Sequence, residues 1–194
     1  MEPAIRGREI TRITHPLDSA ILRINKKSDN VGAENLLKTL AAEKTRNPGS
    51  ARDGAAIMKE FLAGIGIDTL RLTIADGSGV SFYNGVSADA LVRLLVYLHT
   101  DSTLFGRFVR SLPVAGRDGT LKSRMRGSPA EGNVFAKTGS LTGVSALSGY
   151  VRTSGGMLLA FSILCNQVPG ENGIARDIQD QILEILCRHD FPGK

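Results

Sequence analysis

The sequence predicts an α+β protein, with a mainly helical lobe over about residues 15–130 followed by antiparallel strands and a covering helix over about residues 133–190. Three observations support this fold class. Apolar residues recur at helical spacing through most of the first lobe. From Asn133 the pattern changes to short strand-like runs separated by glycine-containing turns. Near the C-terminus it returns to helical spacing, which indicates a final helix packed on the sheet.

Two helices are expected before residue 48. The first begins at Pro16, which fits the first turn of a helix, and it ends at the polar run over residues 26–30. The second ends near Pro48, because proline disfavours helical geometry in the residue before it. The apolar positions of the two helices are Leu17, Ile21 and Ile24, then Ala33, Leu36, Leu37 and Leu40.

The middle of the chain predicts two more helices with a short strand between them. Gly64 and Gly66 should close the third helix, and Ser87 should cap the fourth. Residues 70–74 alternate apolar and polar, which predicts a strand, and residues 76–79 predict a turn. The buried stripes are expected to be Ile57, Met58, Phe61, Leu62 and Ile65 in the third helix, and Leu91, Leu94, Leu95 and Leu98 in the fourth.

The last third of the chain predicts a loop-rich segment, an antiparallel meander and a helix. Residues 101–133 hold weak helical patterns broken by glycine and proline. Strand-like runs follow at residues 134–136, 144–151 and 157–164. The final helix has an apolar stripe that we expect to lie on the sheet: Ile174, Ile178, Ile182, Ile185 and Leu186.

Composition and charge narrow the function classes. With 194 residues and 42% hydrophobic residues, the chain is long enough to bury a core. The net charge is +5, and the segment 107–126 is rich in arginine and lysine with only Asp118 opposing them. Because it has neither interleaved aromatic residues nor a nucleic-acid reading motif, we interpret it as a solvated basic face rather than a nucleic-acid site.

The sequence gives no sign of a metal centre, cofactor or membrane span. The histidines lie far apart without ligand spacing, and Cys165 and Cys187 are interpreted as buried thiols. No stretch approaches the roughly 18 consecutive apolar residues of a membrane span. The N-terminal run MEPAIRGREITRITHP carries charges where a signal peptide has its apolar segment, so no export of the chain as written is expected.

Two tripeptides carry the chemical signal: Ser28-Asp29-Asn30 at a break between helices and Lys137-Thr138-Gly139 at the end of a strand. Either one alone is a weak signal. Together, in this order and in this structural setting, they match two of the three motifs of penicillin-binding proteins and serine β-lactamases, whose third motif is Ser-x-x-Lys.

Four longer stretches extend the likeness: NKKSDNVGAENLLKTLA, DGSGVSFYNGVSADALVRLL, LPVAGRDGTLKSRM and AKTGSLTGVSALSGYV. They resemble the class C low-molecular-mass D-alanyl-D-alanine carboxypeptidases, the penicillin-binding protein 4 or DacB-like family. The likeness spans about residues 25–151, and the remaining elements also fit. It implies that the chain is the C-terminal portion of one DD-peptidase domain, with part of the serine β-lactamase/DD-peptidase fold.

The resemblance implies catalytic roles for three residues. In the family a serine attacks the carbonyl between two D-alanines and forms an acyl-enzyme that water releases. By resemblance, Ser28 relays a proton to the departing amine, Asn30 holds the substrate backbone, and Lys137 places a positive charge beside Ser28. Each also has a plainer interpretation: helix capping for Ser28, a turn for Asn30, and a solvated strand-end cation for Lys137.

The resemblance also implies a substrate-binding strand. Thr138 donates its hydroxyl to the terminal carboxylate, and Gly139 removes a side chain where the substrate backbone lies against the strand. The backbone N–H of Ser140 is one of two oxyanion donors, the other belonging to the nucleophilic serine. The implied partners are peptidoglycan stem peptides ending in D-Ala-D-Ala and β-lactams.

The sequence departs from the family at the nucleophile, because no serine is followed by lysine three positions later. We therefore expect the nucleophile, its lysine base and half of the oxyanion hole to be missing. Loss of the nucleophile of a serine hydrolase costs about 10⁶-fold in turnover, which predicts a chain that is inactive alone. The family's first strands are missing too, which predicts an exposed sheet edge open to an N-terminal half or a second copy.

A second departure is Phe82, where the family's DGSGLS run usually continues with arginine. The preference for a stem-peptide side chain is therefore expected to differ.

Three functions remain open from sequence: a fragment of a serine-type D-Ala-D-Ala carboxypeptidase, a non-catalytic module that binds peptidoglycan peptides or a partner protein, and a β-lactamase relative. The family implies a periplasmic or extracellular location, whereas the chain as written, without a signal peptide, would be cytoplasmic.

Overall fold

The computed structural model describes residues 10, 11 and 13–190. The helices are α1 (Leu17–Lys27), α2 (Asn30–Thr45), α3 (Ala51–Gly64), α4 (Ala88–Thr100), α5 (Ser102–Ser111) and α6 (Gly173–Arg188), with a short 3-10 helix at Gly119–Leu121. The strands are β1 (Val134–Leu141), β2 (Val144–Arg152) and β3 (Leu158–Asn166), and they form a three-stranded antiparallel sheet in the order β1-β2-β3. The predicted α+β fold class is confirmed.

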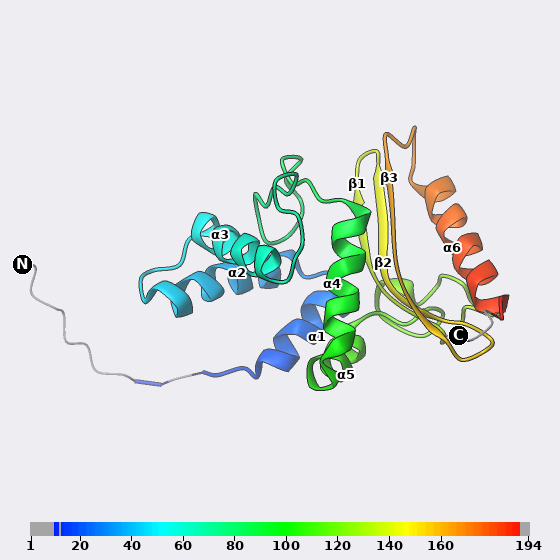
Figure 1. The fold of residues 1–194 in the computed structure, drawn as a ribbon, viewed down its shortest axis with the longest axis horizontal. Helices are drawn as coiled ribbons and strands as arrows, with labels where there is room; N and C mark the ends of the chain where they lie inside the picture. The colour runs from blue at the N-terminus through cyan, green and yellow to red at the C-terminus, as the bar shows by residue number, and fades with distance from the viewer. Residues whose placement is uncertain (1–9, 12, 191–194) are drawn as a thin grey trace, which may run out of the picture.

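Helices cover both faces of the sheet. Figure 1 shows α4 on one face and α6 on the other, with α1 and α5 beside α4, while α2 and α3 project away from the sheet. No helix in the described part of the chain is long and apolar enough to cross a lipid bilayer.

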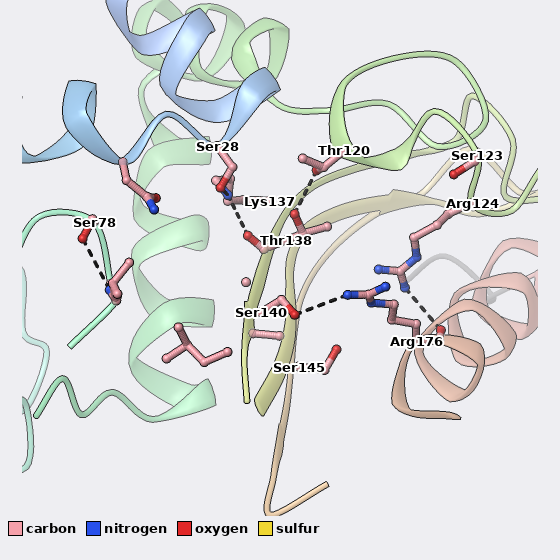
Figure 2. A pocket seen from close by; sticks show the side chains of 16 residues that line it. Ser28, Ser78, Thr120, Ser123, Arg124, Lys137, Thr138, Ser140, Ser145 and Arg176 are labelled. Atoms are coloured by element: carbon pink, nitrogen blue, oxygen red, sulfur yellow. Dashed lines mark hydrogen bonds between the residues drawn. The ribbon is translucent and has the colours of Figure 1, made fainter. Parts of the chain in front are cut away.

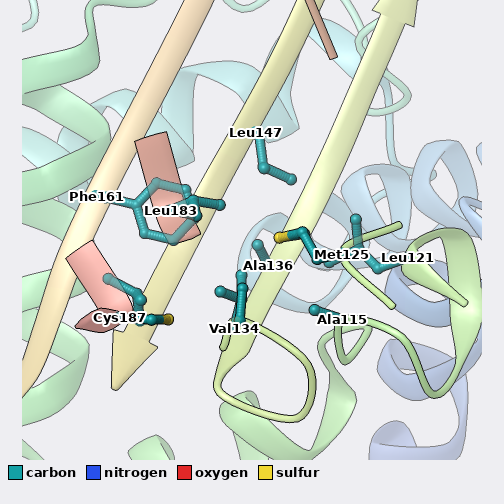
Figure 3. Close-up of a cluster of buried hydrophobic side chains, with 11 residues drawn as sticks. Ala115, Leu121, Met125, Val134, Ala136, Leu147, Phe161, Leu183 and Cys187 are labelled. Carbon is teal, nitrogen blue, oxygen red and sulfur yellow. The ribbon is translucent and has the colours of Figure 1, made fainter. Parts of the chain in front are cut away.

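The larger core lies between the sheet and α6 (Figure 3). Side chains alternate between the two faces of a strand, so every second residue of each strand points toward α6. The buried members of this cluster are Ala115, Leu121, Met125, Val134, Ala136, Leu147, Val151, Phe161, Leu183 and Cys187, together with Ala130. Full burial of one large apolar side chain contributes about 1.5–3 kcal/mol, so this cluster fixes the position of β1.

A second core on the opposite face joins the sheet to the helical lobe. It is built around Tyr150, Leu95 and Leu112. The Tyr150 hydroxyl donates to the carbonyl of Leu95 at 2.7 Å, and burial raises the pKa of Tyr150 to about 12. The ring of Phe105 packs edge-on against Tyr150 with 5.2 Å between centroids. This contact holds α4 and α5 against the strands.

Short polar side chains set where the helices of the lobe begin. The carboxylate of Asp29 accepts the N–H of Gly32 at the start of α2, and the hydroxyl of Ser87 accepts the N–H of Ala90 at the start of α4. Such N-caps satisfy backbone donors that have no partner within the helix. The predicted cap at Ser87 is therefore confirmed.

The predicted strand over residues 70–74 is wrong. Thr73 makes only an isolated antiparallel bridge with Gly85, and Leu70 is 93% exposed. A strand is stable only with a hydrogen-bonded neighbour along its length, and residues 76–85 form a looped segment that supplies just this one bridge. The predicted turn over residues 76–79 lies in that looped segment.

The predicted orientation of the C-terminal helix is also wrong. Four of the five residues in its apolar stripe are exposed, and only Leu186 packs against the core. The side of α6 that faces the sheet is formed instead by Ala175, Gln179, Leu183 and Cys187. Gln179 is fully buried, and its side-chain amide donates to the hydroxyl of Ser145 on β2 at 3.2 Å, which lowers the cost of burying it.

The predicted buried stripe of α3 is only partly right. Met58 is 37% exposed and Phe61 is 49% exposed. The side of α3 that packs most closely on α2 carries small residues, and a Cβ added to Gly54 would lie 2.4 Å from the carbonyl oxygen of Leu37. The close approach of the two backbones therefore decides which side is buried.

The ion pairs of the basic segment 107–126 differ from the expected ones. Asp118 does not oppose its neighbours; it binds Lys26 on α1 at 2.6 Å, while Arg107 pairs with Asp18 at 2.7 Å. Both cysteines are free thiols, and Cys187 is buried while Cys165 is half-buried. The N-terminal run that bears on export lies largely outside the described residues, which leave out 1–9 and 12.

Candidate active site

An open cavity of about 530 Å³ lies where the helical lobe meets the outer edge of β1 (Figure 2). It brings together segments that are far apart in sequence: the junction of α1 and α2, the loop after residue 77, residues 120–124, the strands and α6. All six residues predicted as site residues line it: Ser28, Asn30, Lys137, Thr138, Gly139 and Ser140.

Ser28 owes its position to the tight junction between α1 and α2. It is the C-cap of α1 and adopts a left-handed backbone conformation with φ of 54°. Non-glycine residues occupy this region only at some energetic cost. Asp29 follows as the N-cap of α2 and also pairs with Arg23, so its carboxylate braces the junction while the Ser28 hydroxyl faces the cavity.

Lys137 is the nearest cation to that hydroxyl. Its Nζ donates to Ser28 Oγ at 2.9 Å and to the carbonyl oxygen of Thr138 at 2.6 Å (Figure 2). Burial lowers the pKa of Lys137 below its ordinary value. None of the ion pairs in the described part of the chain includes Lys137. The pair can pass a proton between amine and hydroxyl, because a hydroxyl both donates and accepts.

Among the described residues, the outer edge of β1 is free beyond Ala136, and there it directs backbone donors into the cavity. Across this edge the N–H of Ala136 donates to the carbonyl oxygen of Pro113 at 3.0 Å. Backbone polar groups of a strand point to alternate sides, so the N–H groups of Thr138 and Ser140 lie on the same edge as that of Ala136. A ligand oxygen beside Ser140 can therefore accept a backbone hydrogen bond.

Hydroxyl groups surround this edge. Thr138 Oγ1 is 2.9 Å from Thr120 Oγ1, which fixes the Thr138 side chain at the rim of the cavity. The lining hydroxyls are those of Ser28, Ser78, Thr120, Ser123, Thr138, Ser140 and Ser145. Gly139 lies between the two hydroxyl-bearing residues of β1 and has no side chain to obstruct a ligand.

A hydrogen-bonded loop forms the opposite rim. Glu34 on α2 accepts the N–H groups of Gly77 and Ser78 at 3.0 and 3.2 Å. The carboxylate of Asp76 accepts the N–H groups of Gly79 and Ser81. Burial alone would raise the pKa of Asp76, but these backbone hydrogen bonds hold it below its ordinary value. Glu34 thus ties this rim to α2, while Asp76 holds the loop in shape.

The charged side chains that line the cavity are all positive. Its charged lining side chains, among the residues that the structure describes, are Lys137, Arg124 and Arg176, and none is a carboxylate. Arg124 is neutralised by Asp180 at 2.7 Å, with 12% and 19% of the two side chains exposed. Arg176 takes part in none of the ion pairs found between described residues. The cavity therefore favours an anionic ligand.

Sequence reasoning missed several of the lining residues. Arg124 was interpreted as part of a solvated basic face, yet its side chain is largely buried beside the cavity. The segment LPVAGRDGTLKSRM, which contains Thr120 and Arg124, carried a family resemblance that pointed to it. Arg176 has no motif, and only the packing of α6 brings it to the site. Phe82, the second departure from the family pattern, is 74% exposed and does not line the cavity.

Comparisons with known proteins point to one family. The model of the D-Ala-D-Ala carboxypeptidase 3 (S13) family matches residues 10–189. A D-alanyl-D-alanine carboxypeptidase from Actinomadura sp. (strain R39) is 43% identical over 178 residues, which cover 89% of this chain and 32% of that protein.

Solved structures show the same fold. Penicillin-binding protein 4 (DacB) from Haemophilus influenzae superposes with a TM-score of 0.83 at 28% identity, covering 90% of this chain and 40% of that one. The same protein complexed with a β-lactam gives a TM-score of 0.83 at 29% identity, covering 90% of this chain and 42% of that one. This chain thus spans about a third of the curated relative's length and less than half of the solved chains.

Proposed function

The chain belongs to the D-Ala-D-Ala carboxypeptidase 3 (S13) family, and from this membership we propose that it holds peptidoglycan stem peptides ending in D-Ala-D-Ala for serine-type hydrolysis. In this proposal the cavity supplies the substrate-holding wall and the proton relay, and the acylating serine comes from outside these 194 residues. The location that suits such a substrate is the periplasm or the cell exterior.

The observation that carries the proposal is the composition of the cavity. It combines cationic side chains, a ring of hydroxyls and an exposed strand edge, with no carboxylate among its described lining residues. A peptide with a free C-terminus presents one carboxylate and an extended backbone. Such a peptide can pair with a strand edge through main-chain hydrogen bonds while its charge lies among the cations.

The geometry of the residues supports the roles proposed for them. The N–H of Ser140 points to the edge where a carbonyl oxygen of the peptide would lie, which suits an oxyanion donor. Lys137 and Ser28, 2.9 Å apart, form a relay that can deliver a proton to a departing amine. Asn30 at the start of α2 offers an amide to the peptide backbone, and Thr138 offers its hydroxyl to the terminal carboxylate.

The chain alone is proposed to be inactive. No Ser-x-x-Lys occurs in it, so the acyl-enzyme cannot form by the family's chemistry. A non-catalytic role, holding peptidoglycan peptides without cleaving them, uses the same cavity and is the alternative. A β-lactamase activity would need the same missing nucleophile, and it is the least favoured of the three.

The test uses the purified chain with two probes. A fluorescent penicillin should give no covalent adduct, whereas diacetyl-L-lysyl-D-alanyl-D-alanine should bind reversibly in a calorimetric titration. A covalent adduct would show that an unidentified residue acts as nucleophile and would overturn the proposed division of roles. Absence of peptide binding would overturn the proposed function itself.

A complementation experiment separates the enzyme from the non-catalytic module. The rest of the Actinomadura carboxypeptidase, lacking the part that matches this chain, would be mixed with it. Penicillin labelling that depends on both pieces supports the enzyme fragment. Peptide binding that remains without labelling in the mixture supports the binding module.

A further inference from the structure

We propose that Arg176 of α6, acting through the hydroxyl of Ser140, makes the cavity select ligands with a free terminal carboxylate over ligands whose C-terminus is amidated. The inference rests on the proposed function of the cavity and adds to it a specificity-determining residue outside both sequence motifs. Figure 2 shows the contact between Arg176 of α6 and Ser140 of β1.

Two donors at the start of α6, its N-cap Asn172 and Arg176, converge on Ser140. The side-chain amide nitrogen of Asn172 lies 3.0 Å from Ser140 Oγ, and Nη2 of Arg176 lies 3.3 Å from the same oxygen. A hydroxyl has two acceptor positions and one hydrogen. Neither the amide nitrogen of Asn172 nor the guanidinium of Arg176 can accept a hydrogen bond, so Ser140 keeps its own hydrogen for a third group. Ser140 lines the cavity, so that third group is a ligand acceptor.

The side-chain amide of Asn172 cannot rotate to point its oxygen at Ser140. Its amide nitrogen also lies 2.9 Å from the carbonyl oxygen of Leu141 and 2.8 Å from that of Val144. A rotated amide would place its oxygen against these carbonyl oxygens, which repel it. Asn172 therefore presents its nitrogen to Ser140 and cannot accept the Ser140 hydrogen.

Charge then decides which acceptor is preferred. An amide carbonyl and a carboxylate can both accept from Ser140, but only the carboxylate gains from a nearby cation. Arg124 is already paired with Asp180, at 2.7 Å. Arg176 is part of no ion pair in the described part of the chain, so it brings an unbalanced positive charge to the hydroxyl.

Arg176 can be replaced without disturbing the fold. Its side chain is exposed, its bond to Ser140 is long at 3.3 Å, and the buried side of α6 is formed by other residues. A structural role would therefore be small. A change in ligand preference on replacing Arg176 reports on specificity rather than on folding.

The experiment compares two ligands on the 194-residue chain. Diacetyl-L-lysyl-D-alanyl-D-alanine and its C-terminal carboxamide are titrated by calorimetry into wild type, Arg176→Gln and Arg176→Lys. We expect wild type to prefer the acid, Arg176→Gln to lower the affinity for the acid about fivefold with little effect on the amide, and Arg176→Lys to keep most of the preference. Added salt should narrow the wild-type preference, because it screens an exposed charge.

Arg188→Gln, at the far end of the same helix, is the matched control and should leave both affinities unchanged. A preference that survives in Arg176→Gln overturns the inference and leaves the proposed function standing. Equal binding of acid and amide by wild type overturns the inference and also the part of the proposed function that places the terminal carboxylate among the cations. Failure of wild type to bind either ligand overturns the proposed function together with it. Unfolding curves by circular dichroism should coincide for wild type, Arg176→Gln and Arg176→Lys; a large loss of stability in Arg176→Gln contradicts a role confined to ligand choice.

Discussion

Lys137 Nζ lies 2.9 Å from Ser28 Oγ, although the two residues are 109 positions apart in the chain. The contact joins the C-cap of α1 to the middle of β1, and both residues line the cavity. Burial disfavours the charged form of Lys137, and no carboxylate among the described lining residues compensates it. The pair therefore has measurable consequences for stability as well as for ligand binding.

Replacing Lys137 should change how stability depends on pH. Its folded-state pKa lies below the ordinary value of 10.5, so the unfolded chain holds this proton more tightly than the folded chain does. The charged lysine therefore disfavours folding at neutral pH, and this penalty fades as the pH rises toward 10.5. We expect Lys137→Met to have the higher free energy of unfolding near neutral pH and the difference from wild type to shrink toward that value. Urea denaturation at several pH values measures it.

Lys122→Met, at an exposed lysine outside the cavity, is the control for the general effect of removing one positive charge. A difference between Lys137→Met and wild type that stays constant across this pH range would contradict the assignment of the penalty to burial of Lys137.

Glycine substitutions at the C-caps of α1 and α2 should stabilise the protein to different extents. Ser28 and Arg46 are the C-caps of α1 and α2, with φ of 54° and 58°. Glycine adopts this conformation without the cost of about 1 kcal/mol that other residues bear. Arg46→Gly should raise the free energy of unfolding by about 1 kcal/mol without affecting peptide binding. Ser28→Gly should gain less, because it removes the oxygen that accepts from Lys137, and it should weaken peptide binding.

Thermal unfolding and peptide titration of the two glycine variants test this prediction together. Equal affinities for the stem peptide in Ser28→Gly and wild type would remove Ser28 from the ligand site.

Removing the buried phenol should destabilise the contact between helical lobe and sheet. Tyr150→Phe loses the hydrogen bond to the carbonyl of Leu95, which costs about 1 kcal/mol. The pKa of Tyr150 is raised to about 12 from 10.0, so the folded protein holds this proton more tightly than the unfolded chain. Wild type should therefore lose stability as the pH rises from 10.0 toward about 12, and Tyr150→Phe should lose less.

Chemical denaturation over the alkaline range measures both effects. Tyr83→Phe is the control, since Tyr83 is 84% exposed. The same alkaline slope in Tyr150→Phe and wild type would contradict the role given to the buried phenol.

The outer side of α6 should promote self-association of the isolated chain. Ile174, Ile178, Ile182 and Ile185 are 69%, 48%, 38% and 63% exposed, and within the described residues β3 has no strand on its outer edge. Unpaired edges and contiguous apolar surface favour association. We expect sedimentation velocity to show dimers or larger species that Ile178→Lys reduces.

Leu70→Lys removes an exposed apolar residue that is distant in sequence from α6, and it should leave the distribution unchanged. A monomer at all accessible concentrations would contradict this prediction.

Much of the architecture follows from local sequence. Asp29 and Ser87 cap helices because short polar side chains accept backbone N–H groups, and glycine-containing turns separate strands that alternate in polarity. The two tripeptides and the stretches around them also indicated the six residues that the structure brings into one cavity.

Tertiary packing decided what local patterns could not. The isoleucine stripe of α6 was expected on the sheet, yet the sheet accepts the narrower side that carries Ala175 and Gln179, because that side fits closely and hydrogen-bonds to β2. Residues 70–74 alternate like a strand but have no partner strand. Hydrophobic periodicity shows that one side of a helix could be buried. The shape and the hydrogen bonds of the neighbouring surface decide which side of the helix is buried.

The sequence by itself determined the fold class, the family resemblance and the identity of Ser28, Asn30 and Lys137 as candidates. Only the folded chain decided that Arg176 reaches Ser140 and that Arg124 is neutralised by Asp180. The physical reason is that a charge acts through its distance to other groups and its exposure to water, and both quantities arise from packing between segments far apart in the sequence.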